Sequence, residues 1–388
     1  MVKSQNRLTS VRKIAKSVDQ CSSVSETPPS DSVAVEERIV LAKEKRWLLK
    51  KAVEDLLPNS RTARCCRFTI PIQRDTDGNL INRPSNVGIY RSIENGSTFY
   101  GGLETCSSVW CCPICAAKIS ERRRQELLKI WDIWKSQGGK VYLFTLTFPH
   151  GSYDILSDLQ NKFSKARKKL FSSKGWRKWK EKINLCHHIY TLEVTYGIEN
   201  GWHIHLHCAL FIMPTPDTEI PLASDILPTW QRSCISSGLG KPNDHGVDIS
   251  EGESANNYIS KWGLDLELTK QHSKHGREGH RTPFDLLRAY ADGDLNAGLL
   301  FREFARAFKG KRHIVMSRGL RQALGMGLEK TDKELAQEDV DKAVCIATLT
   351  IRQWDLVLKH DLRFSLLEIA RLEGSEGVRK ALKILSSA

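Results

Sequence analysis

Two apolar β-patterned segments joined by a short turn constrain the fold most strongly. They are residues 187–196 (HHIYTLEVTY) and 203–213 (HIHLHCALFIM), and the residues between them include Asn200-Gly201, a dipeptide typical of hairpin turns. Side chains alternate between the two faces of a strand, so the three histidines of the second segment form one row and the residues between them face the other side. The pattern predicts an antiparallel hairpin with one polar and one buried face.

The row formed by His203, His205 and His207 favours metal binding. An apolar residue between successive histidines allows one face of the strand to hold an ion while the other face packs in a core. The alternative is the solvated polar face of an edge strand, but three alternating imidazoles rarely arise from packing alone.

Glu193, on the first strand of the hairpin, is a candidate further ligand whose position depends on the turn. If the turn is centred on Glu199, Glu193 lies opposite His205 on the same face. If Asn200-Gly201 are the two turn residues, Glu193 lies opposite Cys208 and points away. It is otherwise an exposed strand carboxylate. Two imidazoles and one carboxylate would leave positions on a metal open for a substrate oxygen.

The elements around the hairpin predict an α+β fold with a mainly antiparallel sheet and flanking helices. The order from residue 141 to 264 is β-α-β-β-α-β-α. Besides the hairpin, we expect a strand at 141–148, helical residues at 153–182, a helix at 222–237, a strand at 246–250 and a helix at 252–264.

Flanking segments complete the predicted organisation. Helical spacing of apolar residues predicts helices over 36–57 and 116–136, and residues 283–388 read as helices. The predicted parts are 1–35, a mobile basic and Ser/Pro-rich tail; 36–137, a helix with a cysteine-rich zinc-binding segment; 138–270, the sheet core; and 271–388, a helical C-terminal region.

The cysteines predict a structural zinc site. Cys106, Cys112 and Cys115 follow a knuckle-like spacing, and Cys65 upstream would complete a tetrahedral set. The alternative is a group of buried free thiols. Eleven cysteines is an odd number in a chain too long to depend on disulfides, which favours a reducing, cytoplasmic compartment.

Charge predicts a polyanionic partner. The formal net charge is +14, and residues 161–185 hold ten lysines and arginines against one acidic residue. Phe163, Phe171, Trp176 and Trp179 lie among these cations, so the segment is expected to grip single-stranded nucleic acid by backbone charge and base stacking. Residues 122–124 (RRR) are a second basic cluster. The alternative is a solvated helix face with the aromatic rings in the core.

Tyr258 and Lys261 form a second candidate catalytic pair. They lie three residues apart on the predicted helix 252–264 and so share one face. A phenol is a poor nucleophile unless a nearby cation favours the phenolate, and Lys261 can supply that cation. By itself the pair is indistinguishable from an ordinary amphipathic surface.

Together these motifs resemble the plasmid rolling-circle replication initiators (Rep proteins) of the HUH endonuclease superfamily. FTLTF (144–148), GWHIHLH (201–207) and YISK (258–261) are similar to the family's three motifs and occur in the same order. The segment ARCCR…TCSSVWCCPICAAKI resembles a cysteine-rich segment of one branch, and residues 299–325 also resemble that branch. The resemblance covers roughly residues 60–330.

The resemblance implies an HUH/RRM-like nuclease core and a metal-assisted DNA strand transfer. His205, His207 and Glu193 would hold Mg²⁺ or Mn²⁺ at the scissile phosphate. Tyr258, aided by Lys261, would form a 5′-phosphotyrosine link and free a 3′-hydroxyl primer. Zinc would be structural, on Cys65, Cys106, Cys112 and Cys115. The implied partners are single-stranded and duplex origin DNA, a host helicase and a DNA polymerase.

One departure concerns termination of the reaction. Some relatives carry a glutamate three or four residues before the tyrosine, where this chain has Ala255 and Ser254. Glu251 or Glu253 is the expected substitute.

Alternative functions are a relaxase or single-strand transposase of the same superfamily, a hydrolytic metalloenzyme, or a non-catalytic zinc-dependent DNA-binding regulator. The chain contains no GxxxxGK[ST] phosphate loop, and no apolar run approaches the ~18 residues of a membrane span. The N-terminal residues contain no apolar signal-peptide region.

Overall fold

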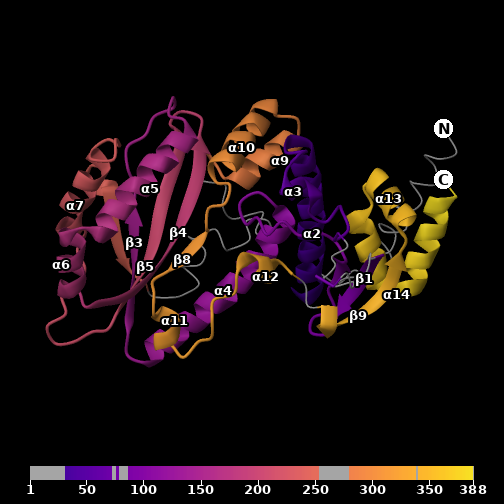
Figure 1. Ribbon diagram of the computed structural model, residues 1–388, viewed down its shortest axis with the longest axis horizontal. Coiled ribbons are helices and arrows are strands. Elements are labelled where there is room, and N and C mark those ends of the chain that lie inside the picture. Colours follow the sequence, from indigo (N-terminus) through magenta and orange to yellow (C-terminus); the bar gives the residue numbers. More distant parts are fainter. Residues whose placement is uncertain (1–30, 72–75, 78–85, 253–278, 338–339, 388) are drawn as a thin grey trace. The chain divides into compact units, whose positions relative to one another are not determined.

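The computed structural model describes residues 31–71, 76–77, 86–252, 279–337 and 340–387 (Figure 1). The chain divides into two compact units. One is residues 108–332, and the other combines Met1–Ser107 with Lys333–Ala388.

A six-stranded antiparallel sheet forms the centre of the 108–332 unit. Five strands follow the order β6-β3-β5-β4-β7, and β8 also pairs with β4. The strands are β3 (Lys140–Leu146), β4 (Leu185–Gly197), β5 (Gly201–Ile212), β6 (Val247–Glu251), β7 (His280–Arg281) and β8 (Ile314–Met316).

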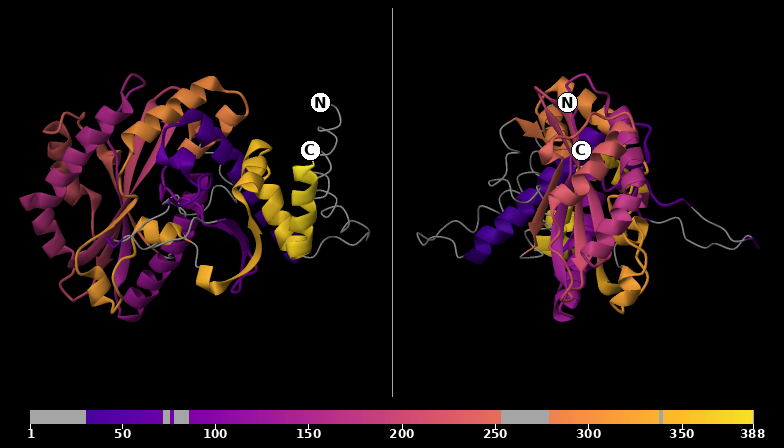
Figure 2. Two further views of the ribbon diagram at one scale, coloured as in Figure 1. Left: turned by 45° about the vertical axis from the view of Figure 1, so that its right-hand side comes forward. Right: turned by 90° about the vertical axis from the view of Figure 1, so that its left-hand side faces the viewer.

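Helices cover this sheet on both faces (Figure 2). Phe144 of β3 packs against Trp176 and Trp179, so the helices that follow β3 cover one face. On the other face, Trp134 of α4 packs against Phe211 of β5. The helical segments of this unit are α4 (Pro113–Ser136), α5 (Leu156–Ser172), α6 (Lys174–Lys182), α7 (Ala223–Ile235), η1 (Asp244–Gly246), α9 (Pro283–Ala291), α10 (Leu295–Ala307) and α11 (Leu320–Ala323).

Helix α4 covers only one end of its face. Its buried residues pack with Val141 and Leu143 of β3, with Ala209 and Phe211 of β5 and with Ile189 of β4. The β-strand register places the histidine row on the same face, towards the other end of β5. One face of the sheet is therefore core at one end and polar at the other.

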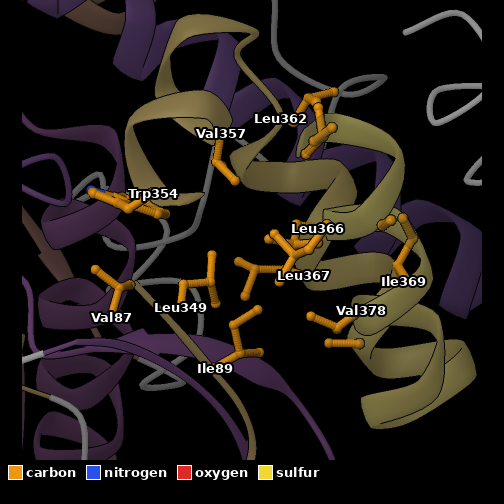
Figure 3. Close-up of a cluster of buried hydrophobic side chains, with 14 of the residues drawn as sticks. Val87, Ile89, Leu349, Trp354, Val357, Leu362, Leu366, Leu367, Ile369 and Val378 are labelled. Atoms are coloured by element: carbon orange, nitrogen blue, oxygen red, sulfur yellow. The ribbon is translucent and has the colours of Figure 1, made fainter. Parts of the chain in front are cut away.

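The second unit is a smaller α+β assembly around the antiparallel sheet β2-β1-β9. Its apolar core joins β1 and β9 to the two C-terminal helices, with Trp354 and Leu366 among the buried residues (Figure 3). Its elements are α2 (Asp31–Leu56), α3 (Arg61–Arg64), β1 (Val87–Ser92), β2 (Thr98–Gly101), η2 (Val340–Lys342), β9 (Ala343–Leu349), α13 (Ile351–Lys359) and α14 (Arg363–Ser386), while α12 (Asp332–Ala336) begins at the boundary between the units.

A buried ion-pair network stabilises the second unit. Arg363 Nη1 and Lys50 Nζ both donate to Glu54 Oε1, at 2.7 and 2.6 Å. The side chains of Lys50 and Arg363 are at most 2% exposed, so removing Glu54 would leave buried charges unpaired.

The predicted mixed α+β fold with an antiparallel sheet, flanking helices and a helical C-terminus is confirmed. The helical stretch 153–182 is two helices, because Ser173 ends α5 and caps α6 by accepting a hydrogen bond from the Trp176 N–H. The predicted helix 252–264 falls mostly within 253–278, outside the described residues.

The division into units differs from the predicted boundaries. Strands β7 and β8, which lie beyond residue 270, pair with β4, and β9 pairs with β1. Pairing between distant segments therefore assigns residues 279–332 to the sheet unit and the last 56 residues to the other. Among the helices described, none is long and apolar enough to cross a membrane.

Candidate active site

The register of the β4–β5 hairpin decides the position of Glu193. Gly197 pairs with Gly201, which centres the turn on Glu199, and Glu193 pairs with His205. Gly201 has φ of 71°, and a Cβ there would lie 2.9 Å from Ser152 Cα, so the turn requires glycine. The first of the two predicted registers is therefore confirmed.

The three histidines lie in a row on one face of β5, as predicted. The ring centroids of His203 and His205 are 3.8 Å apart, and those of His205 and His207 are 5.8 Å apart with nearly parallel planes. Ile204 and Leu206, which face the other side, are fully buried. The alternation seen in the sequence thus separates a polar site from the core.

Hydrogen bonds hold His207 at both ring nitrogens. Its Nε2 lies 2.8 Å from Glu193 Oε2, and its Nδ1 lies 3.1 Å from Thr145 Oγ1. A carboxylate only accepts, so in the neutral imidazole the bond to Glu193 places the proton on Nε2 and Nδ1 accepts from the Thr145 hydroxyl. A metal ion at Nε2 would require the other tautomer, in which Nδ1 donates to Thr145.

The pair Glu193 and His207 has the spacing of two neighbouring ligands of a divalent cation, although among the described residues only the cysteines form a group of three or more close metal donors. Burial is the main cause that lowers the pKa of His205 to about 4, and it likewise lowers the pKa of His203 to about 3. These imidazoles are therefore neutral at physiological pH, as a metal ligand must be. Adjacent ligands of an octahedral ion at about 2.1 Å lie about 3 Å apart, close to the separation between Glu193 and His207.

The sequence interpretation missed other polar groups on this face. By register, Asp248 of β6 pairs with Thr145, and Thr145 and Thr191 both pair with His207. Thr191 is fully buried, and its Oγ1 has no hydrogen-bond partner among the described residues. In the sequence, these groups are marked only by the alternation of polar and apolar residues in FTLTF (144–148) and VDISE (247–251). That alternation does not show which face of each strand carries the site.

Glu251 lies in a strand and not in a helix. It ends β6 and pairs with Tyr142, and both residues face away from the histidine row. The expectation that Glu251 precedes Tyr258 on one helix was therefore wrong. Glu253, Tyr258 and Lys261 lie within 253–278, outside the described residues.

The predicted cysteine quartet is brought together. The sulfur atoms of Cys65, Cys106, Cys112 and Cys115 all lie within 4.8 Å of one another. Cys106 is partly exposed, and the other three cysteines are buried. Cys112 caps α4, where its sulfur accepts a hydrogen bond from the Cys115 N–H. Four thiolates around Zn²⁺ at about 2.3 Å would lie about 3.8 Å apart, so the set fits a metal such as zinc.

The prediction that aromatic residues of 161–185 stack on bases was wrong for three of them. Phe163, Trp176 and Trp179 are at most 3% exposed, in contact with other core rings. Their helical spacing turns them towards the sheet and leaves the cations outside. Lys165, Lys168, Lys174, Arg177 and Lys178 are exposed.

The second basic cluster is largely structural. Arg123 is buried and pairs with Glu126 and Asp332, and Arg124 pairs with Glu121 on the preceding turn of α4. These carboxylates satisfy the guanidinium groups, which weakens the expectation that residues 122–124 bind phosphates.

Comparisons with known proteins match this region to replication proteins. Residues 102–216, which include the hairpin and three of the quartet cysteines, match the model of a family described as Replication protein. The chain is 28% identical over 371 residues to a "Protein rep" from Streptomyces lividans, covering 76% of this chain and 80% of that one.

Two shorter similarities were also found. One is to a "Protein rep" from Lentilactobacillus hilgardii, 29% identical over 106 residues, covering 27% of this chain and 32% of that one. The other is to a "Neomycin resistance protein" from Streptomyces cyanogenus, 27% identical over 148 residues, covering 32% and 34%. No solved structure matches the chain.

Proposed function

We propose that this protein is a plasmid replication initiator that nicks single-stranded origin DNA by tyrosine transesterification. The observation that carries the proposal is the placement of Glu193 opposite His205 and 2.8 Å from His207, on one face of an antiparallel hairpin. The match to the Replication protein family spans this hairpin, and the relatives named "Protein rep" support the same role.

Mg²⁺ or Mn²⁺ bound by His205, His207 and Glu193 would withdraw charge from a non-bridging oxygen of the scissile phosphate and orient that group. Thr145 would hold His207 in the tautomer that leaves Nε2 unprotonated. The exposed cations of α5 and α6 belong to the helix layer on the opposite face of the sheet, so they would meet only DNA that extends beyond the site.

Tyr258 is the proposed nucleophile, with Lys261 favouring its phenolate form. The phenolate oxygen attacks phosphorus, a new O–P bond forms, and the bond from phosphorus to the 3′ oxygen breaks. The 3′ oxygen takes a proton and becomes the primer hydroxyl. Because one phosphodiester replaces another, the strand can be rejoined without ATP.

The test uses the full-length protein with Mn²⁺ and single-stranded oligonucleotides tiled across the replicon that encodes it. We expect a protein–DNA adduct that survives SDS, together with a free 3′-hydroxyl fragment. The adduct should be lost with EDTA, with His207→Ala and with Tyr258→Phe. Tyr153→Phe is the matched control, because this ring is 98% exposed in the loop between β3 and α5.

An adduct that survives Tyr258→Phe would refute the nucleophile assignment. Cleavage that releases a free 5′-phosphate without an adduct would instead indicate a hydrolytic metalloenzyme. DNA binding without cleavage of any tiled oligonucleotide would favour a non-catalytic regulator.

A further inference from the structure

A cleft of about 540 Å³ lies beside the histidine row. Its walls come from the residues that follow β3, from the hairpin with His280, and from the loop that precedes β6. The volume lies within the range of about 300–1,000 Å³ typical of small-molecule sites, which leaves room for about one nucleotide.

The residues that line the cleft suit a ligand that has both an anionic group and a planar ring. Among the described residues that line it, none is acidic, and Lys241 contributes a cation. The other polar groups include four imidazoles, those of His150, His203, His245 and His280. Lysine pairs with phosphate, and planar rings stack on bases.

Hydrogen bonds hold the walls of the cleft in place. Trp230, which is fully buried, donates its indole N–H to the Thr147 carbonyl at 2.7 Å. The Thr147 hydroxyl donates to the His245 carbonyl at 3.3 Å, and Gln231 donates to the Pro242 carbonyl at 2.8 Å. The site is therefore shaped before any ligand arrives.

The hairpin side of the cleft joins it to the proposed metal ligands. His150 Nδ1 donates to the Asn200 carbonyl at 2.9 Å, and the His150 ring lies 4.4 Å from the His203 ring. The His203 ring in turn lies 3.8 Å from that of His205. A nucleotide in the cleft would thus be the immediate neighbour of a phosphate held at His205.

We propose that the cleft binds one unpaired nucleotide of the DNA strand, adjacent to the phosphate that is cut, with Lys241 at a backbone phosphate and His245 against the base. This inference rests on the proposed function and adds a binding site to it. Neither residue has been placed in the reaction itself.

The test measures binding in EDTA, so that no cleavage occurs, by fluorescence anisotropy of the full-length protein. The probes are fluorescein-labelled dT12 and a 12-mer of the same length made of abasic sites. We expect Lys241→Ala to weaken dT12 binding about tenfold. Lys140→Ala, which removes an exposed lysine at the other end of β3, should weaken it by no more than about twofold.

His245→Ala separates base from backbone recognition. The imidazole is exposed, and the hydrogen bonds that residue 245 forms with described residues use its backbone, so the variant should fold. We expect it to weaken dT12 binding about fivefold and to leave the abasic 12-mer unchanged.

Equal losses of dT12 affinity in Lys241→Ala and Lys140→Ala would overturn the proposal, because nonspecific electrostatic attraction would then explain the binding. Loss of abasic binding in His245→Ala equal to the loss for dT12 would overturn base recognition. If thymidine 5′-monophosphate competes as well as dT12, the cleft belongs to a free nucleotide.

The proposed nicking reaction can fail separately from this site. A loss specific to Lys241→Ala without an adduct in the nicking assay would refute the nicking reaction and retain the strand-binding site. An adduct in that assay with equal losses for Lys241→Ala and Lys140→Ala would refute the cleft alone.

Discussion

Glu193→Gln tests the candidate metal site with the least change of shape. Glutamine keeps the side-chain length and one carbonyl oxygen but removes the negative charge. In the wild-type chain, the carboxylate is 2.8 Å from His207 Nε2 and its side chain is 39% exposed. Its hydrogen bond with His207 therefore adds only about 1 kcal/mol to the free energy of unfolding.

The effect on metal affinity should be much larger. Two unit charges 4 Å apart attract by about 4 kcal/mol at an effective dielectric constant of about 20, and solvent exposure reduces this. Removing a carboxylate ligand from a divalent cation should therefore cost about 2–3 kcal/mol of binding free energy. That corresponds to a Kd increase of roughly 30- to 150-fold.

The assay is a titration with Mn²⁺, followed by electron paramagnetic resonance of the free ion. Glu199→Gln is the matched control, because this carboxylate lies exposed in the turn of the same hairpin. We expect the control to bind Mn²⁺ like the wild type, and both variants to melt within about 2 °C of it. An unchanged Kd in Glu193→Gln would refute the assignment of Glu193 as a ligand.

Two further predictions concern zinc and acid stability. We expect elemental analysis to find about one tightly bound zinc per chain. The zinc should be lost in Cys112→Ser but retained in Cys234→Ser, which changes a buried thiol outside the quartet. If the purified protein contains no zinc, the four cysteines are buried thiols without a metal. His313 is held neutral because burial, and then Arg123, lower its pKa from the usual 6.5 to about 4. Since the unfolded chain binds this proton first, the free energy of unfolding should fall as the pH drops from about 6.5 to 4, by up to about 3 kcal/mol for this group, and change no further below. Urea unfolding at pH 7 and pH 5 should show a smaller acid loss in His313→Gln than in the wild type, and equal losses would contradict the argument.

Local alternation was enough to predict the hairpin and its histidine row, because a strand with one buried face must place every second residue in the core. It was not enough to choose the register. The choice depended on Gly201 adopting a positive φ against the backbone of Ser152, a contact from a loop some fifty residues earlier. Spacing likewise predicted the cysteine quartet, since the thiols of Cys112 and Cys115 lie one helical turn apart at the start of α4.

Composition gave a wrong prediction where the packing partner of a segment could not be known from the sequence. Trp176 and Trp179 stand among lysines, which in sequence suggests a base-stacking surface, but Phe144 of the sheet takes both rings into the core. The C-terminal residues showed helical periodicity, and the pairing of β9 with β1 depends on a partner about 250 residues earlier. No local pattern encodes such a partner.

Strand β3 explains why the proposed metal ligands and the cleft form one surface. Its Thr145 hydroxyl meets His207, and two residues later Thr147 forms a wall of the cleft while its carbonyl accepts the indole N–H of Trp230. The same strand is anchored in the core through Phe144. Because alternate residues of one rigid strand alternately fill the core and line the site, the positions of the site residues are set by the core packing on the opposite face. A change in that packing would therefore move the histidine and cleft groups together.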